Sequence, residues 1–178
     1  MPRHVLIVGG SGMLSEVARA LARDGGRLSH LSRRASAAWG EDGYDCDYHD
    51  EVRFAAALDL AIGRWGRPDL AIAWFRTLKI AAPRLLAQAV DGRMFQVLGS
   101  GVADPQQPDR LKTAAAVAEG LEGCRLRQVV LGFRVEDGGA RWLRHEEIAL
   151  GVLGAISADR TFSVIGEVDR WRARPRSA

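Results

Sequence analysis

A glycine-rich turn follows the first apolar run of the chain, and its residues are suited to binding a pyrophosphate. Gly9 and Gly12 come directly after Val5–Val8, and Met13 begins a segment with helical spacing. A strand, a turn and a helix N-terminus in this order point backbone N–H groups at one spot, where the pyrophosphate of a dinucleotide binds. Gly9 permits the tight turn, and Gly12 lets the backbone approach the phosphate closely. The third glycine of the dinucleotide fingerprint is replaced here by Ser15.

Two arginines follow the second predicted strand, at the place where a dinucleotide-binding protein selects its cofactor. The chain reads Leu31-Ser32-Arg33-Arg34 there. An acidic residue at this place binds the ribose 2′-hydroxyl of NAD, whereas arginine binds the 2′-phosphate of NADP through charge-assisted hydrogen bonds. Arg33 and Arg34 therefore favour NADP(H) over NAD(H). The alternative is that both arginines belong to a solvated loop.

Alternating strands and helices must position these residues. Short apolar runs predict strands, and apolar residues at helical spacing predict helices. The predicted strands are Val5–Val8, Arg27–Leu31, Tyr44–Asp47, Leu70–Trp74, Met94–Leu98, Arg127–Leu131 and Thr161–Ile165. The predicted helices are Met13–Arg23, Glu51–Trp65, Ile80–Val90, Leu111–Leu121 and His145–Ser157. Strands separated by such helices favour right-handed crossovers, so the sequence predicts a Rossmann-like α/β fold with a doubly wound parallel sheet of about seven strands in three α/β/α layers.

Several motifs resemble those of the short-chain dehydrogenase/reductase superfamily, along most of the chain. The turn Gly9–Leu14 resembles that family's cofactor loop, Asp47-Tyr48 its adenine contact, Leu98-Gly99-Ser100 its fifth strand with the catalytic serine, and Leu131-Gly132-Phe133 the segment bordering the nicotinamide. Ala73-Trp74 and Arg141–His145 resemble segments of small, atypical bacterial members. The cofactor contacts that we predict from the motifs and the resemblance are Gly9, Ser11, Gly12, Met13, Leu14, Ser32, Arg33, Arg34, Asp47, Tyr48, Ala73, Gly99, Gly132 and Phe133.

The chain departs from this family at its acid–base pair. The family has a Tyr-x-x-x-Lys motif beyond the serine, but the only tyrosines here, Tyr44 and Tyr48, lie far upstream. Reduction of a ketone produces an alkoxide that needs a proton donor or an oxyanion stabiliser, whereas reduction of an iminium ion produces a neutral amine and needs neither so strongly. We therefore expect a substrate with a C=N bond or an activated carbonyl. Histidine is the side-chain type suited to proton exchange near neutral pH. The candidate catalytic residues are therefore His145, followed by Lys112 and Ser100.

Aromatic and cationic residues near the same strand ends are candidates for substrate binding. Arg76 is suited to binding a carboxylate, and Trp74, Phe75 and Trp142 to forming an apolar wall. Each candidate also has a structural interpretation. Ser100 is suited to capping the turn after the fifth strand, His145 to starting a helix, and the tryptophans to packing in the core.

Two functions agree with this pattern. The first is an atypical NADPH-dependent oxidoreductase that transfers hydride to a small imine or activated carbonyl. The alternative is a non-catalytic NADP(H)-binding sensor that regulates a partner protein, since some relatives without the tyrosine act in this way. An open space beside the nicotinamide distinguishes the enzyme from a sensor in which Trp74 or Trp142 fills that space.

Length and composition indicate the number of domains, the location of the protein and its kinds of partner. A length of 178 residues fits one domain over 1–178, with a basic tail over 168–178, and no apolar run is long enough to cross a bilayer. The N-terminus lacks the layout of a signal peptide, and Cys46 and Cys124 lack disulfide or metal-ligand spacing. We expect a cytoplasmic protein with reduced thiols, no metal and no membrane or nucleic-acid partner, since nucleic-acid binding rests only on the net charge of +3. The family's extra substrate-covering segment has no counterpart after the final strand, which favours a homo-oligomer.

Overall fold

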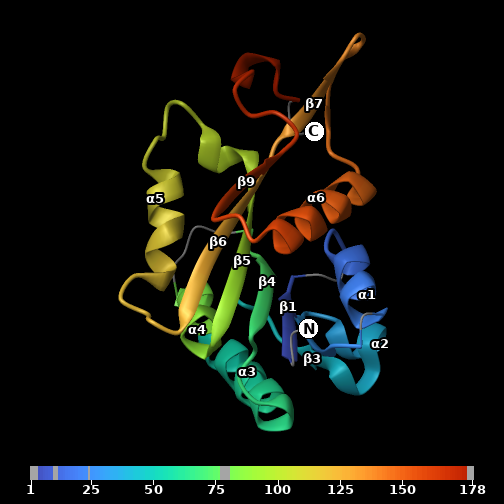
Figure 1. The fold of residues 1–178 in the computed structure, drawn as a ribbon, viewed down its shortest axis with the longest axis vertical. Helices are drawn as coiled ribbons and strands as arrows, with labels where there is room; N and C mark the ends of the chain where they lie inside the picture. The colour runs from blue at the N-terminus through green and yellow to red at the C-terminus, as the bar shows by residue number, and fades with distance from the viewer. Residues whose placement is uncertain (1–3, 10–11, 24, 77–80, 176–178) are drawn as a thin grey trace.

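A seven-stranded parallel sheet forms the centre of the molecule. The computed structural model describes residues 4–9, 12–23, 25–76 and 81–175. The strand order is β3-β2-β1-β4-β5-β6-β9, and each of its pairings is parallel. Helices cover both faces: Figure 1 shows α1 and α6 on one side of the strands and α4 and α5 on the other. The predicted Rossmann-like, doubly wound α/β fold is therefore confirmed.

The elements follow one another in the predicted alternation. The sheet strands are β1 His4–Val8, β2 Arg27–Ser32, β3 Gly43–Asp45, β4 Leu70–Trp74, β5 Gly92–Gly99, β6 Cys124–Leu131 and β9 Phe162–Ile165. An antiparallel hairpin outside the sheet consists of β7 Phe133–Glu136 and β8 Gly139–Trp142. The α-helices are α1 Ser15–Arg23, α2 Ala35–Trp39, α3 Glu51–Trp65, α4 Ala81–Ala89, α5 Arg110–Ala115 and α6 His145–Ala158. Short 3-10 turns occupy Gly40–Asp42, Ser100–Ala103, Ala116–Ala118 and Trp171–Ala173.

The core is divided by the sheet into two apolar layers. Every residue of β1 is buried, as expected for a central strand that has helices on both faces. Val5 and Ile7 pack with α1 and α6, whereas Leu6 and Val8 face the opposite layer with α3 and α4. The alternation of side chains along a strand places successive residues of β1 in different layers. Asp50 caps α3, as its side chain accepts a hydrogen bond from the backbone N–H of Arg53 at 3.1 Å.

The structure differs from the sequence prediction in three places. The segment predicted as one helix over Leu111–Leu121 is the short helix α5 followed by a 3-10 turn that ends at Ala118. Arg84 accounts for this early end, because its guanidinium donates hydrogen bonds to the carbonyls of Ala116, Val117 and Glu119 at 3.2 to 3.5 Å. Helix α2 and the β7–β8 hairpin were not predicted. Ile80, the first residue of the predicted helix Ile80–Val90, lies outside the described residues, as does the tail beyond Pro175.

The topology fixes where a ligand can bind. Strand β1 pairs with β2 on one side and with β4 on the other, so the crossover connections turn to opposite sides of the sheet at this point. In open parallel sheets, ligands bind at the carboxyl ends of the strands beside such a switch point. No helix in the described ranges is long and apolar enough to cross a membrane. In the same ranges, no group of three or more histidine, cysteine or acidic side chains is placed to hold a metal ion.

Candidate functional site

Three adjoining clefts lie at the carboxyl ends of β1, β4, β5 and β6. The glycine cleft, of about 480 Å³, is lined by Gly9, Gly12, Met13, Ser32, Arg33, Cys46, Asp47, Tyr48, His49, Trp74 and Arg76. The serine cleft, of about 430 Å³, includes Ser100, Gly132, Trp142 and His145. The arginine cleft, of about 360 Å³, includes Phe75, Arg110 and Arg174. Trp74 and Arg76 line all three clefts, so the loop after β4 joins them into one continuous site.

Two glycines shape the floor of the glycine cleft in different ways. Gly9 has a φ of +77°, and a Cβ at this position would overlap the carbonyl oxygen of Trp74. Its N–H donates to the carbonyl of Leu31 at 3.0 Å, so the turn is packed between β2 and β4. A Cβ at Gly12 would meet nothing within 4 Å, which leaves open space in front of the N-terminus of α1. Ser11, a predicted cofactor contact, lies outside the described residues.

The end of β2 presents a hydroxyl and a cation to this cleft. Ser32 is buried, and its Oγ has no hydrogen-bond partner among the described residues. The exposed Arg33 lines the cleft beside it. A buried polar atom without a partner is costly unless a ligand or water satisfies it. Arg34 is also exposed, but it stands at the start of α2 and is not among the cleft-lining residues, so the structure separates the two arginines that we predicted together.

The segment after β3 forms the far wall of the glycine cleft. Asp47 and Tyr48 both line it, and the Tyr48 hydroxyl accepts a hydrogen bond from the backbone N–H of Arg76 at 3.3 Å. The Tyr48 ring also packs edge-on against Phe75, with ring centroids 5.2 Å apart. Cys46 lies in the same wall, and burial raises the pKa of its thiol to about 11. The thiol therefore stays protonated near neutral pH, which makes it a poor nucleophile.

A cation from the end of the described chain reaches the serine cleft. Ser100 is 4% exposed, and its Oγ accepts a hydrogen bond from Nε of Arg174 at 3.1 Å. The Arg174 guanidinium lies over the rings of Trp142 and Trp171, at 5.1 and 4.8 Å from their centroids. Sequence reasoning missed Arg174 because it treated the basic tail as solvated. Trp171, an aromatic residue in that tail, was the available signal that the segment packs onto the protein.

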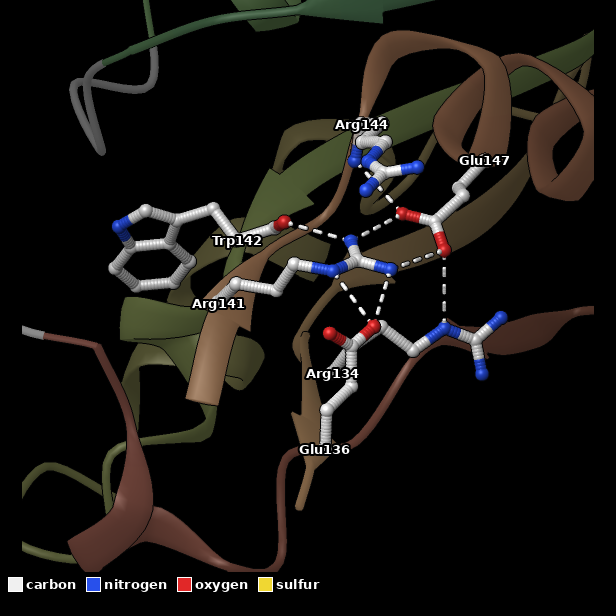
Figure 2. A network of polar contacts seen from close by, with 6 residues as sticks. All are labelled: Arg134, Glu136, Arg141, Trp142, Arg144 and Glu147. Atoms are coloured by element: carbon white, nitrogen blue, oxygen red, sulfur yellow. Dashed lines mark hydrogen bonds and ion pairs between the residues drawn. The ribbon is translucent and has the colours of Figure 1, made fainter. Parts of the chain in front are cut away.

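A network of ion pairs holds the β7–β8 hairpin on the first turn of α6 (Figure 2). Glu147 accepts hydrogen bonds from the guanidinium of Arg141 at 2.8 and 3.1 Å and from the backbone N–H of Arg144 at 2.8 Å. These bonds, those from Arg141 foremost, lower the pKa of Glu147 to about 2. Figure 2 also shows the Trp142 indole directed away from the network. The network thus fixes the strand that carries Trp142 to the helix that begins at His145.

Some predicted site residues lie elsewhere. Lys112 does not line any of the three clefts: its side chain is 85% exposed on α5 and pairs with Asp109 at 3.6 Å, so we correct its assignment as a catalytic candidate. Leu14, Ala73 and Phe133 are fully buried in the protein interior, so their side chains are not available to a ligand. Gly132 and Gly99 do line the serine cleft. A Cβ at Gly132 would overlap the backbone of Glu167, which gives this glycine a structural role as well.

Comparisons with solved structures agree with the topology described above. A short-chain dehydrogenase/reductase from Serratia marcescens is 16% identical, with 93% of this chain and 96% of that chain covered and a TM-score of 0.62. The chain has the fold of the short-chain dehydrogenases/reductases. An aldohexose dehydrogenase from Thermoplasma acidophilum is 10% identical, with 99% and 96% covered and a TM-score of 0.69.

A third structure of this fold was determined with a dinucleotide. It is a blue fluorescent protein from a metagenomic library in complex with NADPH, 18% identical, with 92% of this chain and 96% of that chain covered and a TM-score of 0.67. No protein-family model and no curated protein sequence matches the chain. At these identities the likeness establishes the fold. The roles of the individual site residues stay predictions.

Proposed function

We propose that this protein binds NADPH in the glycine cleft and reduces a small imine or activated carbonyl in the serine cleft. The observation that carries the proposal is the continuity of the two clefts, which share Met13, Trp74 and Arg76. An extended dinucleotide needs such a continuous path, because its phosphates bind at the glycine turn while its reactive ring lies beside the substrate.

The residues of the glycine cleft fit this cofactor. The open space at Gly12 suits a pyrophosphate at the N-terminus of α1. Arg33 and the unpartnered Ser32 hydroxyl are suited to the 2′-phosphate that distinguishes NADPH from NADH. Asp47 and Tyr48 line the far wall, where the adenine is expected. Bound NADPH supplies a hydride from its nicotinamide ring.

The serine cleft offers a hydroxyl, a cation and an imidazole to a substrate. Ser100 accepts from Arg174, so its own hydroxyl hydrogen is free to donate to a substrate oxygen or nitrogen. Arginine keeps its proton, so Arg174 can stabilise developing negative charge but cannot serve as the acid. His145 lines the same cleft and is the candidate proton donor for a carbonyl. An iminium substrate becomes a neutral amine on reduction and requires no such donor.

The shape of the serine cleft favours catalysis over the alternative of a non-catalytic sensor. A sensor that evolved from this fold would fill the space beside the nicotinamide with a bulky side chain. Trp74 and Trp142 instead line a cleft of about 430 Å³, and a volume of this size suits a small organic substrate.

The experiment that tests the proposal is a titration of the purified protein with NADPH and with NADH, followed by tryptophan fluorescence. We expect tighter binding of NADPH, and a loss of about tenfold or more in NADPH affinity for Arg33→Gln, with NADH binding unchanged. Arg125→Gln is the matched control, because this exposed arginine lies at the opposite edge of the sheet, near the start of β6. Equal binding of both nucleotides, or no binding, would overturn the cofactor assignment.

A second measurement separates the enzyme from the sensor. The protein with NADPH is incubated with a panel of cyclic imines and activated carbonyls, and NADPH oxidation is followed by absorbance. Oxidation with at least one panel member is expected. Tight NADPH binding without oxidation by any of them would contradict the reductase and favour the sensor.

A further inference from the structure

Three arginines converge on the arginine cleft, and among its lining residues there is no acidic side chain. Arg76, Arg110 and Arg174 line it together with Trp74, Phe75, Leu98, Gly99, Gly101 and Val102. We propose that this cleft binds a carboxylate of the substrate, with Arg174 as the principal contact, so that the substrate class is a small organic acid. The proposal rests on the proposed function, because it places the carboxylate beside the reacting group at Ser100.

Arg174 is held in a position that leaves donors free. Its Nε donates to Ser100, and its guanidinium lies over the indole rings of Trp142 and Trp171. Within the described residues, no carboxylate forms an ion pair with Arg174. The two terminal nitrogens carry N–H donors in a planar fork that matches a carboxylate.

The two other arginines are also without acidic partners in the described part of the chain. Arg110 donates one hydrogen bond to the carbonyl of Gly101 at 3.3 Å. Within the described residues the Arg76 guanidinium forms no hydrogen bond or ion pair, and only the backbone N–H of Arg76 donates, to Tyr48. Two other half-buried arginines do pair with carboxylates, Arg141 with Glu147 and Arg127 with Asp159. Three cations beside one cleft repel one another, and the anion that removes this cost is not supplied by the described residues.

The walls of the cleft specify what the anion is attached to. Trp74, Phe75, Leu98 and Val102 are apolar, so they favour a compact hydrocarbon or aromatic body. A volume of about 360 Å³ limits the size of that body. Ser100 lies next to the arginines through its contact with Arg174, so a C=O or C=N group close to the carboxylate would reach the hydroxyl. A 2-oxo acid or a cyclic imino acid has this arrangement.

The test compares two probes of the same shape that differ in charge, benzoate and benzamide, by calorimetric titration of the protein without nucleotide. We expect benzoate to bind at least about tenfold more tightly than benzamide, since a bidentate guanidinium contact requires the carboxylate. Arg174→Gln should abolish the preference for benzoate over benzamide, by weakening the binding of benzoate alone. Arg174→Lys should restore this preference in part. Arg172→Gln, an exposed arginine on the same turn, is the matched control and keeps the preference.

Several outcomes would overturn the proposal. These are equal affinity for the two probes, no benzoate binding, or an unchanged preference in Arg174→Gln. If that variant is unstable, as judged by its melting temperature, Arg110→Gln provides the same comparison from a different element. Inorganic phosphate that binds more tightly than benzoate would identify a phosphate site instead. The titration is repeated with NADP⁺ bound, and loss of benzoate binding there would mean that the arginines hold the cofactor's phosphates. Failure of the proposed function is detected separately, as loss of NADPH binding or oxidation.

Discussion

Arg141 on β8 and Glu147 on α6 are joined by two hydrogen bonds of 2.8 and 3.1 Å, in the fork-to-fork arrangement of a guanidinium and a carboxylate (Figure 2). This pair connects a hairpin that lies outside the main sheet to a helix that packs on it. Trp142 follows Arg141 directly, and His145 precedes Glu147 by two residues. The geometry of the serine cleft therefore depends on an ion pair that does not itself line the cleft.

Removing this pair should loosen the hairpin. We expect Glu147→Gln to lower the melting temperature by a few degrees at neutral pH, because it removes the charge that Arg141 and the backbone of Arg144 stabilise. The folded-state pKa of Glu147, about 2, lies below its ordinary value of 4.5, so the stabilisation is present above pH 4.5 and is lost as pH falls toward 2. Thermal unfolding of both proteins across this range checks the sign. Glu146→Gln, an exposed neighbour, is the control, and a difference that persists at pH 2 would contradict the explanation.

The two glycines of the cofactor turn should respond to alanine in opposite ways. Gly9→Ala places a Cβ against the Trp74 carbonyl in a left-handed backbone conformation, so we expect a loss of about 1–3 kcal/mol in the free energy of unfolding. Gly12→Ala meets no protein atom within 4 Å and should fold normally, but its methyl group occupies the space proposed for the pyrophosphate. Urea unfolding and NADPH titration measure the two effects. If Gly12→Ala binds NADPH as tightly as the unaltered protein, the phosphates bind elsewhere.

Replacing the buried serine should separate the two substrate classes. For Ser100→Ala we expect kcat/KM for an activated carbonyl to fall by about 100-fold, because the developing oxyanion loses a hydrogen-bond donor. The loss should be much smaller for an iminium substrate, and NADPH affinity should not change. Ser157→Ala, exposed on α6, serves as the control. Equal losses for both substrates would indicate that Ser100 acts by holding Arg174 rather than by donating to the reacting group.

A buried histidine should make the protein sensitive to mild acid. His30 is fully buried, stacks on Trp39 at 5.2 Å and has neither ring nitrogen hydrogen-bonded within the described residues. Burial lowers its pKa from 6.5 to about 4. Because the unfolded chain binds the proton more readily, the free energy of unfolding should fall by roughly 3 kcal/mol as pH drops from 6.5 to 4.

The variant His30→Leu tests this dependence. Urea unfolding at several pH values measures the free energy of unfolding. Between pH 6.5 and 4 this free energy should fall much less in His30→Leu than in the unaltered protein, because most of the fall of roughly 3 kcal/mol comes from His30. His4, whose pKa burial also lowers, keeps a residual dependence in both proteins. Identical pH dependence of the two proteins would exclude His30 as the cause.

Much of the architecture could be predicted because parallel strands in a sheet covered by helices on both faces have a strong sequence signal. Segments such as Val5–Val8 and Leu70–Trp74 are buried on both sides, so they are continuous apolar runs in the sequence. Such runs leave few secondary structures other than a strand. The cleft-lining positions Gly12 and Arg33 followed from their places after predicted strands, whereas Tyr48 followed from the family resemblance. Local sequence was sufficient where a residue's position is set by its own strand.

Arg174 could not be predicted, because its position depends on long-range packing. The residue lies 74 positions from Ser100, and in the cleft it contacts Ser100 and the rings of Trp142 and Trp171. The hairpin was missed for a similar reason: Glu136, Arg141 and Glu147 read as ordinary surface charges until the fold places them together. Lys112 shows the opposite error, since the sequence offered it as an alternative proton donor, while its side chain lies in solvent.

The contact between Ser100 and Arg174 also determines when, during translation of the chain, the serine cleft can form. Strands β1 and β2 leave the ribosome before β4, β5, β6 and β9, and domains can begin to fold as the nascent chain emerges. Arg174 lies 74 positions after Ser100, so this whole stretch must be translated before the last wall of the cleft can form. A partly synthesised chain can therefore form the glycine cleft while the serine cleft is still incomplete. Translation order alone therefore delays completion of the serine cleft until nearly the whole chain described here has been made.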